Sequence, residues 1–339
     1  MSALQLLSGL FALFLVNSTA YAKELLYIEA RQSKEIHIVD AATFEHLGKI
    51  DVGFPTDDVI GSPDGKMVYG NGFIPNGNPV GFSDTGVVYG ISTATNKIIW
   101  WGSIPGTPQH LAVSPDGKRL YVPSLSMNHI YVIDTATGRT IDTIPSIIGN
   151  HGTELSKDGK RLYIGNALLH RLDIYDTENG QIIKIMPTRE GVRPFKFDGD
   201  EKRVYYQLSN FQGFEVRDIE TGELVKTVNL PKLAPGLKAD SFGTVNHGLA
   251  LTPDGKKLVA AASLEGYVAM YSLPDLKLLG TVPVGEDPNW IRIRADSKIA
   301  FVSNRGSNDI SAVDLDKMKE VVRIPAGTRP ERFDIVDVK

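Results

Sequence analysis

A short turn motif recurs along the chain and constrains the fold more than any other feature. The motif has the form Ser-Pro-Asp-Gly-Lys, and its six copies begin at Ser62, Ser114, Ser156, Asp198, Thr252 and Arg294. Proline presets φ, aspartate bonds to nearby backbone and glycine accepts a positive φ, so this sequence suits a tight turn. An alternating apolar strand follows, such as Leu120–Val122 after the second copy. The motif therefore predicts a series of β-hairpins.

A second motif follows each copy of the first. It is an alternating strand that ends in Asp or Ser before a short turn and another strand. The marker residues are Asp40, Ser92, Asp134, Asp176, Asp218, Ser272 and Asp314. Four of the six spacings between markers are 42 residues, and the other two are 52 and 54. A repeat of this length with four short strands is typical of a propeller blade, so we expect an all-β, seven-bladed β-propeller.

The ends of the chain explain why the first motif occurs six times and the second seven times. Residues 24–53 predict three strands of a blade without its innermost strand, and residues 329–339 predict one such strand alone. If the C-terminal strand joins the N-terminal blade, the ring closes and leaves no open sheet edge between first and last blades. Residues 23–339 are therefore expected to form one domain.

The first 22 residues have the pattern of a signal peptide. An apolar run from Leu4 to Val16 precedes Ala20-Tyr21-Ala22, and the polar chain begins at Lys23. This order predicts cleavage after Ala22, although residues 2–20 contain no Lys or Arg. The alternative is a buried N-terminal helix. The run is too short for a membrane span, so we expect a soluble, periplasmic or secreted protein.

The repeats resemble the YVTN family of β-propellers, which includes YncE-like periplasmic proteins. The resemblance is carried by the Ser-Pro-Asp-Gly-Lys turns, by Leu120–Val122 and by the run Val132–Thr137, and it covers residues 24–339. It implies the fold, because these are turn and core residues. It also implies a binding or interaction protein, accessory to a periplasmic redox or uptake system. Lactonases and lyases built on propellers keep the alternative of an enzyme open.

Composition narrows the functional classes further. The net charge is −4, from 36 basic and 40 acidic residues, so the chain lacks the basic character of nucleic-acid-binding proteins. The absence of cysteine excludes thiolate nucleophiles, Cys-ligated zinc and c-type haem attachment. No Gly-x-Ser-x-Gly motif occurs, and Ser62, Ser114 and Ser156 belong to the turn motif. We expect a monomer.

One position in the repeat is polar in every blade. It lies five residues before the turn motif, where each innermost strand meets the mouth of the central channel. From blade 1 to blade 7 this position, here called the polar ring, is occupied by Glu331, Asp57, Gln109, His151, Arg193, His247 and Asn289. The residues two positions further along are mostly apolar and are predicted to be core. The polar ring, with His110 one residue beyond it, is the candidate binding site.

Two interpretations of the polar ring remain open. Any hydrated channel mouth is polar, so the ring need not bind a ligand. The functional interpretation rests on an acidic arc of Glu331 and Asp57 facing a basic arc of His151, Arg193 and His247. Such a field suits a small charged molecule, with Arg193 holding a carboxylate or phosphate, or a periplasmic partner protein.

A metal site is the sharpest chemical hypothesis. His151, His247 and Asp57 (or Glu331) would form a set of two histidines and one carboxylate, suited to a divalent transition metal such as Zn, Fe or Cu. Arg193 between the histidines disfavours a cation, and closely spaced ligand motifs are absent. An enzyme that uses these histidines as acid or base, without metal, is a further alternative.

Two blades carry long insertions, around residues 73–84 and 230–243. Both are predicted to lie on the face of the polar ring, where long loops often have functional roles. Neutral variation in loop length is the alternative.

Overall fold

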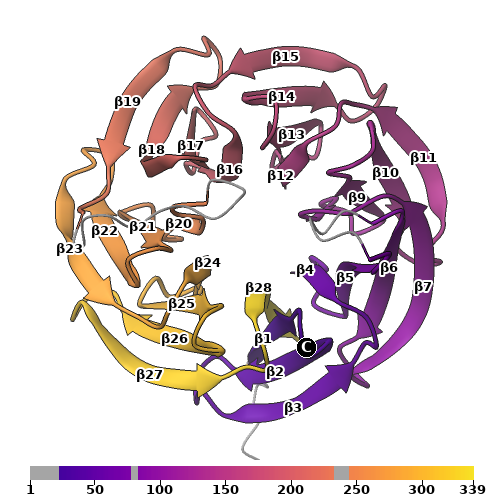
Figure 1. Ribbon diagram of the computed structural model, residues 1–339, viewed down its shortest axis with the longest axis horizontal. Helices are drawn as coiled ribbons and strands as arrows, with labels where there is room; N and C mark the ends of the chain where they lie inside the picture. Colours follow the sequence, from indigo (N-terminus) through magenta and orange to yellow (C-terminus); the bar gives the residue numbers. More distant parts are fainter. Residues whose placement is uncertain (1–22, 78–82, 233–243) are drawn as a thin grey trace, which may run out of the picture.

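The computed structural model describes residues 23–77, 83–232 and 244–339, and within them every regular element is a β-strand. Seven sheets of four antiparallel strands are arranged as blades around a common axis (Figure 1). This confirms the predicted seven-bladed propeller. The expected signal peptide and parts of both long insertions fall outside the described residues. No helix in the described part is long and apolar enough to cross a membrane.

The strands of each blade are given from the axis outward. Blade 1 contains β28 (Pro330–Val338), β1 (Lys23–Ala30), β2 (Glu35–Asp40) and β3 (His46–Asp51). Blade 2 contains β4 (Thr56–Gly61), β5 (Met67–Ile74), β6 (Thr85–Ser92) and β7 (Lys97–Pro105). Blade 3 contains β8 (Ala112–Val113), β9 (Arg119–Pro123), β10 (His129–Asp134) and β11 (Thr140–Pro145). Blade 4 contains β12 (Asn150–Leu155), β13 (Arg161–Asn166), β14 (Arg171–Asp176) and β15 (Ile182–Pro187).

The remaining three blades follow the same order. Blade 5 contains β16 (Val192–Phe197), β17 (Arg203–Leu208), β18 (Phe211–Asp218) and β19 (Leu224–Asn229). Blade 6 contains β20 (Leu249–Leu251), β21 (Lys257–Ala262), β22 (Tyr267–Ser272) and β23 (Leu278–Pro283). Blade 7 contains β24 (Pro288–Ile293), β25 (Ile299–Asn304), β26 (Asp309–Asp314) and β27 (Lys319–Pro325).

The ring closes through blade 1, which joins the two ends of the propeller. Strand β28, yellow in Figure 1, lies beside the indigo strand β1 and pairs with it antiparallel, with Val338 opposite Lys23 and Phe333 opposite Ile28. Phe333 is fully buried and packs between blades 1 and 7 with Phe301. The closure predicted from the two incomplete ends of the repeat is confirmed.

The turn motif is held by its own side chains. In the second copy, Ser114 Oγ donates to Asp116 Oδ1 at 2.6 Å and accepts from the Arg119 amide at 2.9 Å. Gly117 has a φ of +72°, in the left-handed region where glycine is favoured. The same bonds recur at Ser62 and Ser156. These serines therefore fix the turn, as predicted.

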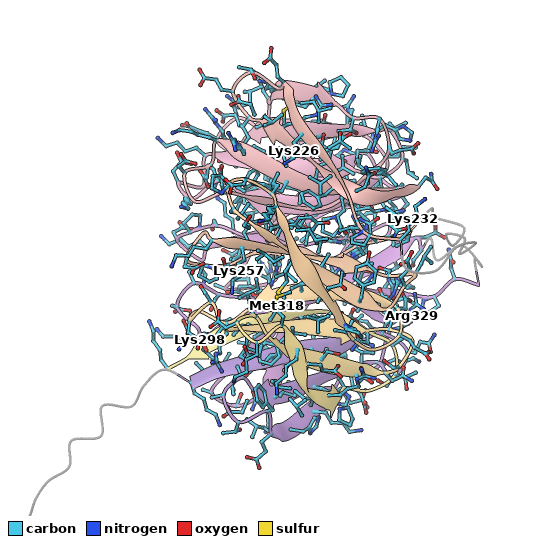
Figure 2. The ribbon with its side chains drawn as sticks, turned by 90° about the vertical axis from the view of Figure 1, so that its left-hand side faces the viewer. Lys226, Lys232, Lys257, Lys298, Met318 and Arg329 are labelled. Carbon is cyan, nitrogen blue, oxygen red and sulfur yellow. The ribbon has the colours of Figure 1, made fainter. Side chains whose placement is uncertain are left out.

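The core lies between neighbouring blades. The recurrent tyrosines expected in it are buried: Tyr27, Tyr69, Tyr121, Tyr163 and Tyr205. The side view separates the two faces of the disc (Figure 2). Lys298, in a turn motif, lies on one face, which we call the turn face. Arg329, just before β28, lies on the other, which we call the mouth face. Lys232, near the start of the second long insertion, lies on the side of Arg329.

Candidate functional site

A cavity of about 800 Å³ opens at the centre of the mouth face. All seven residues of the polar ring line it, each from the innermost strand of one blade or from the segment just before that strand: Glu331, Asp57, Gln109, His151, Arg193, His247 and Asn289. Each is at most 6% exposed. The repeat alignment therefore located the lining of one cavity, here called the mouth cavity.

Four arginines that the repeat did not identify also line the mouth cavity. Arg31 lies between β1 and β2, Arg305 lies between β25 and β26, and Arg329 and Arg332 flank Glu331. None of them occupies the polar-ring position: Arg332 follows it in β28, and Arg31 and Arg305 occupy equivalent positions just after the second strands of blades 1 and 7. The other five blades hold no arginine at that position, so the repeat gives little indication of these side chains.

These arginines neutralise the acidic arc. Arg31 donates to Glu331 Oε2 at 2.9 Å and also pairs with Asp57. Arg332 Nη1 lies 2.8 Å from Asp57 Oδ2, and Arg329 Nε donates to Glu331 Oε1 at 2.6 Å. Burial alone would raise the pKa of Glu331, but the surrounding arginines, Arg31 foremost, hold it well below its usual range. The acidic arc expected from the sequence is thus not a free negative surface.

The basic arc also differs from the expectation. Burial is the main cause that holds the pKa of His151 and His247 well below the ordinary value, and the charges of Arg193 and Arg332 add to it. Both imidazoles are therefore neutral at physiological pH. Arg193 carries the positive charge of this side, and its Nε donates to Ser209 Oγ at 2.9 Å.

The charged side chains that line the mouth cavity are positive in total. Five arginines line it against three carboxylates, which leaves an excess of two positive charges: Arg31, Arg193, Arg305, Arg329 and Arg332 against Asp57, Glu190 and Glu331. Positive charge gathered in a cleft with low-dielectric walls raises the local concentration of anions. The cavity is therefore suited to an anion rather than to the zwitterion that a split ring would favour.

Asn289 has unused hydrogen-bonding capacity at the same place. Its side chain is 1% exposed and lines the mouth cavity, yet neither its amide nitrogen nor its oxygen has a hydrogen-bond partner among the described residues. Buried polar atoms are nearly always paired in native proteins. Asn289 thus offers a donor and an acceptor to a polar molecule in the cavity.

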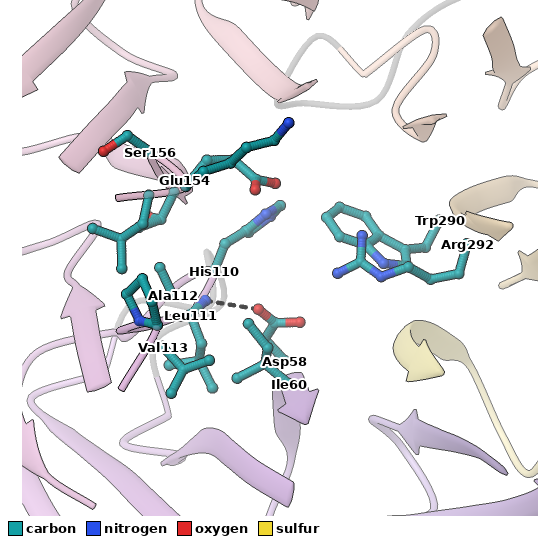
Figure 3. Close-up of a pocket in the computed structure, with 14 residues that line it drawn as sticks. Asp58, Ile60, His110, Leu111, Ala112, Val113, Glu154, Ser156, Trp290 and Arg292 are labelled. Atoms are coloured by element: carbon teal, nitrogen blue, oxygen red, sulfur yellow. Dashed lines mark hydrogen bonds between the residues drawn. The ribbon is translucent and has the colours of Figure 1, made fainter. Parts of the chain in front are cut away.

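A second, smaller cavity of about 190 Å³ lies on the turn-face side of the polar ring (Figure 3). His110, Trp290 and Arg292 line it together with Asp58, which accepts a hydrogen bond from the Leu111 amide at 2.8 Å. The two cavities share no lining residue. The side chains of His110 and Trp290, 5.0 Å apart between ring centroids, lie beside His151 and His247, between the two cavities.

Three histidines meet at this boundary. The ring centroid of His110 lies 4.5 Å from that of His151 and 6.0 Å from that of His247, and the latter two are 5.5 Å apart. One nitrogen of each lies within 4.8 Å of the others. The sequence predicts Asp57 or Glu331 as the third metal ligand beside His151 and His247. In the structure His110 meets the two histidines, whereas Asp57 pairs with Arg31 and Arg332.

The buried carboxyl group of Glu29 makes the stability of the folded protein depend on pH. Glu29 is fully buried, and its pKa is raised from 4.5 to about 8, first by burial and then by Glu331. Between those values the folded state binds more protons than the unfolded chain. Glu29 therefore contributes stability that is complete below pH 4.5 and is lost as the pH rises through about 8, by up to about 1.4 kcal/mol per pH unit.

We expect Glu29→Gln to flatten the decline of the free energy of unfolding between about pH 7 and pH 8, where folded Glu29 still holds a proton that the unfolded chain has lost. Urea unfolding at a series of pH values measures this slope. Glu320→Gln, on the outer strand β27, is the control and should keep the wild-type slope. An unchanged slope in Glu29→Gln would show that Glu29 is already ionised below pH 7.

Comparison with known proteins supports the architecture. A model of the YNCE-like β-propeller family matches residues 81–339. No curated protein matches the sequence significantly. Among solved structures, the periplasmic gluconolactonase PpgL of Pseudomonas aeruginosa superposes with a TM-score of 0.74 at 16% identity, covering 94% of this chain and 100% of that one.

Two further solved structures illustrate the range of proteins with this fold. A putative 6-phosphogluconolactonase from Bacteroides fragilis has a TM-score of 0.74 at 18% identity, covering 94% of this chain and 99% of that one. Hydrazine synthase from Kuenenia stuttgartiensis has a TM-score of 0.66 at 19% identity, covering 82% of this chain and 88% of that one. At these identities the likeness establishes the fold alone.

Proposed function

The chain belongs to the YNCE-like β-propeller family, and from that premise we propose that it binds a small organic anion, bearing a carboxylate or a phosphate, in the mouth cavity. The observation that carries the proposal is the excess of arginine over carboxylate among the residues that line this cavity. A volume of about 800 Å³ is within the range of small-molecule sites, which is about 300–1,000 Å³.

The lining supplies the contacts that such an anion needs. Arg193 presents a planar guanidinium that pairs with two oxygens of a carboxylate or phosphate at once. Asn289 supplies the unused donor and acceptor, and Gln109 contributes a second side-chain amide from blade 3. The neutral side chains of His151 and His247 can donate or accept, so they suit the hydroxyl groups of an anion such as a sugar acid.

Two broader aspects of the role are part of the same proposal. The signal-peptide pattern of residues 1–22 supports export to the periplasm or beyond. A ligand-binding propeller there would serve as an accessory to a redox or uptake system. A partner protein that inserts an acidic side chain into the mouth cavity would use the same arginines.

An enzymatic role for the same cavity is the second candidate. His151 favours it, because its imidazole is held neutral and its Nδ1 is buried without a hydrogen-bond partner among the described residues. A neutral imidazole can act as general base. Two structural neighbours are named as lactonases, so an anionic sugar lactone is the natural substrate to test.

One experiment tests binding and catalysis together. Calorimetric titration of chelator-treated protein with 6-phosphogluconate is expected to show saturable binding that weakens with added salt. Arg193→Ala is expected to weaken it by about 10- to 100-fold, the worth of a charge-assisted hydrogen bond. Arg323→Ala, on the outer strand β27, is the control. Ring opening of 6-phosphogluconolactone, measured in parallel and compared with His151→Gln, reports catalysis.

Binding that is unaffected by Arg193→Ala would place the anion elsewhere. Absence of binding for phosphate, citrate and sugar acids alike would overturn the proposal. Binding without ring opening would leave a binding protein and remove the lactonase.

A further inference from the structure

We propose that His110, His151 and His247 form a three-histidine site for a divalent transition metal at the boundary between the two cavities. The inference goes beyond anion binding, because it assigns His151 and His247, which also line the mouth cavity, a different ligand together with His110. The three residues come from blades 3, 4 and 6 and are far apart in the sequence. Their potential ligand nitrogens lie within 4.8 Å of one another, so inward shifts of about 1 Å would bring them to the separations found around tetrahedral zinc.

Hydrogen bonding prepares these imidazoles to act as ligands. His247 Nδ1 lies 3.1 Å from the Asn289 carbonyl oxygen, which can only accept, so Nδ1 carries the proton and Nε2 keeps its lone pair. A backbone carbonyl on the second ring nitrogen is the usual orienting partner of a metal-binding histidine. His110 Nε2 and His151 Nδ1 are both buried and have no hydrogen-bond partner among the described residues.

Local sequence explains why His110 reaches the other two. The residues equivalent to His110 in blades 4, 5 and 6 are Gly152, Pro194 and Gly248, so these blades contribute no long side chain at this level. Trp290 of blade 7 packs edge-on against His110 at 5.0 Å and supports it from the side of the smaller cavity. The imidazole of His110 therefore lies over the axis, beside His151 and His247.

The three histidine nitrogens determine which metals suit the site. Three neutral imidazoles suit Zn²⁺ or Cu²⁺, and they leave at least one coordination position open. Because His151 and His247 line the mouth cavity, an anion held there would lie beside the proposed metal site. The charges of Arg193 and Arg332 act against a dication. An anion at the open position would offset this charge, so metal and anion are expected to bind more tightly together than apart.

Titration of chelator-treated protein with Zn²⁺ alone tests the site. We expect one equivalent to bind, and Co²⁺ in its place to give the visible spectrum of a low-coordinate site. His110→Gln and His247→Gln, checked for folding by circular dichroism, are expected to weaken Zn²⁺ binding by about 100-fold or more. Even loss of an outer-shell partner costs about 10- to 100-fold. His170→Gln, which lines the mouth cavity away from the cluster, is the matched control.

A second measurement keeps the test decisive if these variants fail to fold. Trp290 adjoins His110, so Cu²⁺ bound at the cluster is expected to quench tryptophan emission in the wild type. Trp290→Phe should lose that quenched component. The proposal is overturned if wild type and both histidine variants bind Zn²⁺ equally, if His170→Gln loses binding equally, or if Cu²⁺ leaves Trp290 emission unchanged. Anion binding is measured with chelator, so its outcome is independent of this one.

Discussion

A chain that ends at Arg329 is expected to lose the folded propeller. Without β28, blade 1 has no innermost strand, and the inner edge of β1 is left unpaired. The side chain of Phe333 is fully buried, and removing one buried phenylalanine side chain typically costs about 3–5 kcal/mol. The net stability of a domain is about 5–15 kcal/mol, so loss of the whole strand is expected to exceed it. Circular dichroism and limited proteolysis would show an unfolded or partly folded chain.

Moving the C-terminal strand to the N-terminus provides a control for this deletion. Val338 lies opposite Lys23 in the β28–β1 pair, so the end of β28 is next to the start of β1. Residues 330–339 placed before Lys23 through a short glycine-rich turn are therefore expected to restore cooperative unfolding. Deleting Lys339 alone, outside β28, should have no effect. If the chain lacking 330–339 still unfolded cooperatively near the wild-type temperature, closure would be dispensable.

Arg332→Ala is expected to destabilise the protein by about 3–5 kcal/mol, the cost of breaking a buried ion pair by removing one partner. Arg332 is 4% exposed and lies 2.8 Å from Asp57, which is 1% exposed. Without it, Asp57 keeps Arg31 only, and Asp58, whose pKa is raised by burial to about 7, loses one of the positive charges that oppose this rise. Urea unfolding near neutral pH measures the loss.

Two further variants distinguish the loss of the buried ion pair from the mere removal of an arginine side chain. Arg323→Ala, which removes an exposed pair with Glu320, is expected to cost about 1 kcal/mol or less. Combining Arg332→Ala with Asp57→Asn removes both charges and should recover part of the loss. A cost for Arg332→Ala no larger than that for Arg323→Ala would show that water screens the Asp57 pair.

The fold was predictable from the sequence because each blade repeats the same local rules. Ser114, Asp116 and Gly117 show why: the three residue types fix one turn together, and the same combination recurs in the copies that begin at Ser62 and Ser156. The polar ring was predictable for the same reason, since equivalent positions in a repeat occupy equivalent places around the axis.

The chemistry of the site was less predictable, because it depends on contacts between non-equivalent positions. Arg31 reaches the acidic arc from a loop, and no periodic pattern connects it with Asp57 or Glu331. The neutral state of His151 and His247 arises from burial, which residue type alone does not reveal. His110 was recognised as adjacent to the ring, but its approach to His247 depends on the short residues of the blades between them.

His110 and Trp290 lie between the two cavities of this propeller, and the two cavities have separate linings. The anion proposed for the mouth cavity would therefore be lined by none of the residues that line the smaller cavity. The smaller cavity, on the other side of His110 and Trp290, can hold a different solute. The mouth cavity and the smaller cavity can therefore be occupied at the same time by solutes that do not compete with each other.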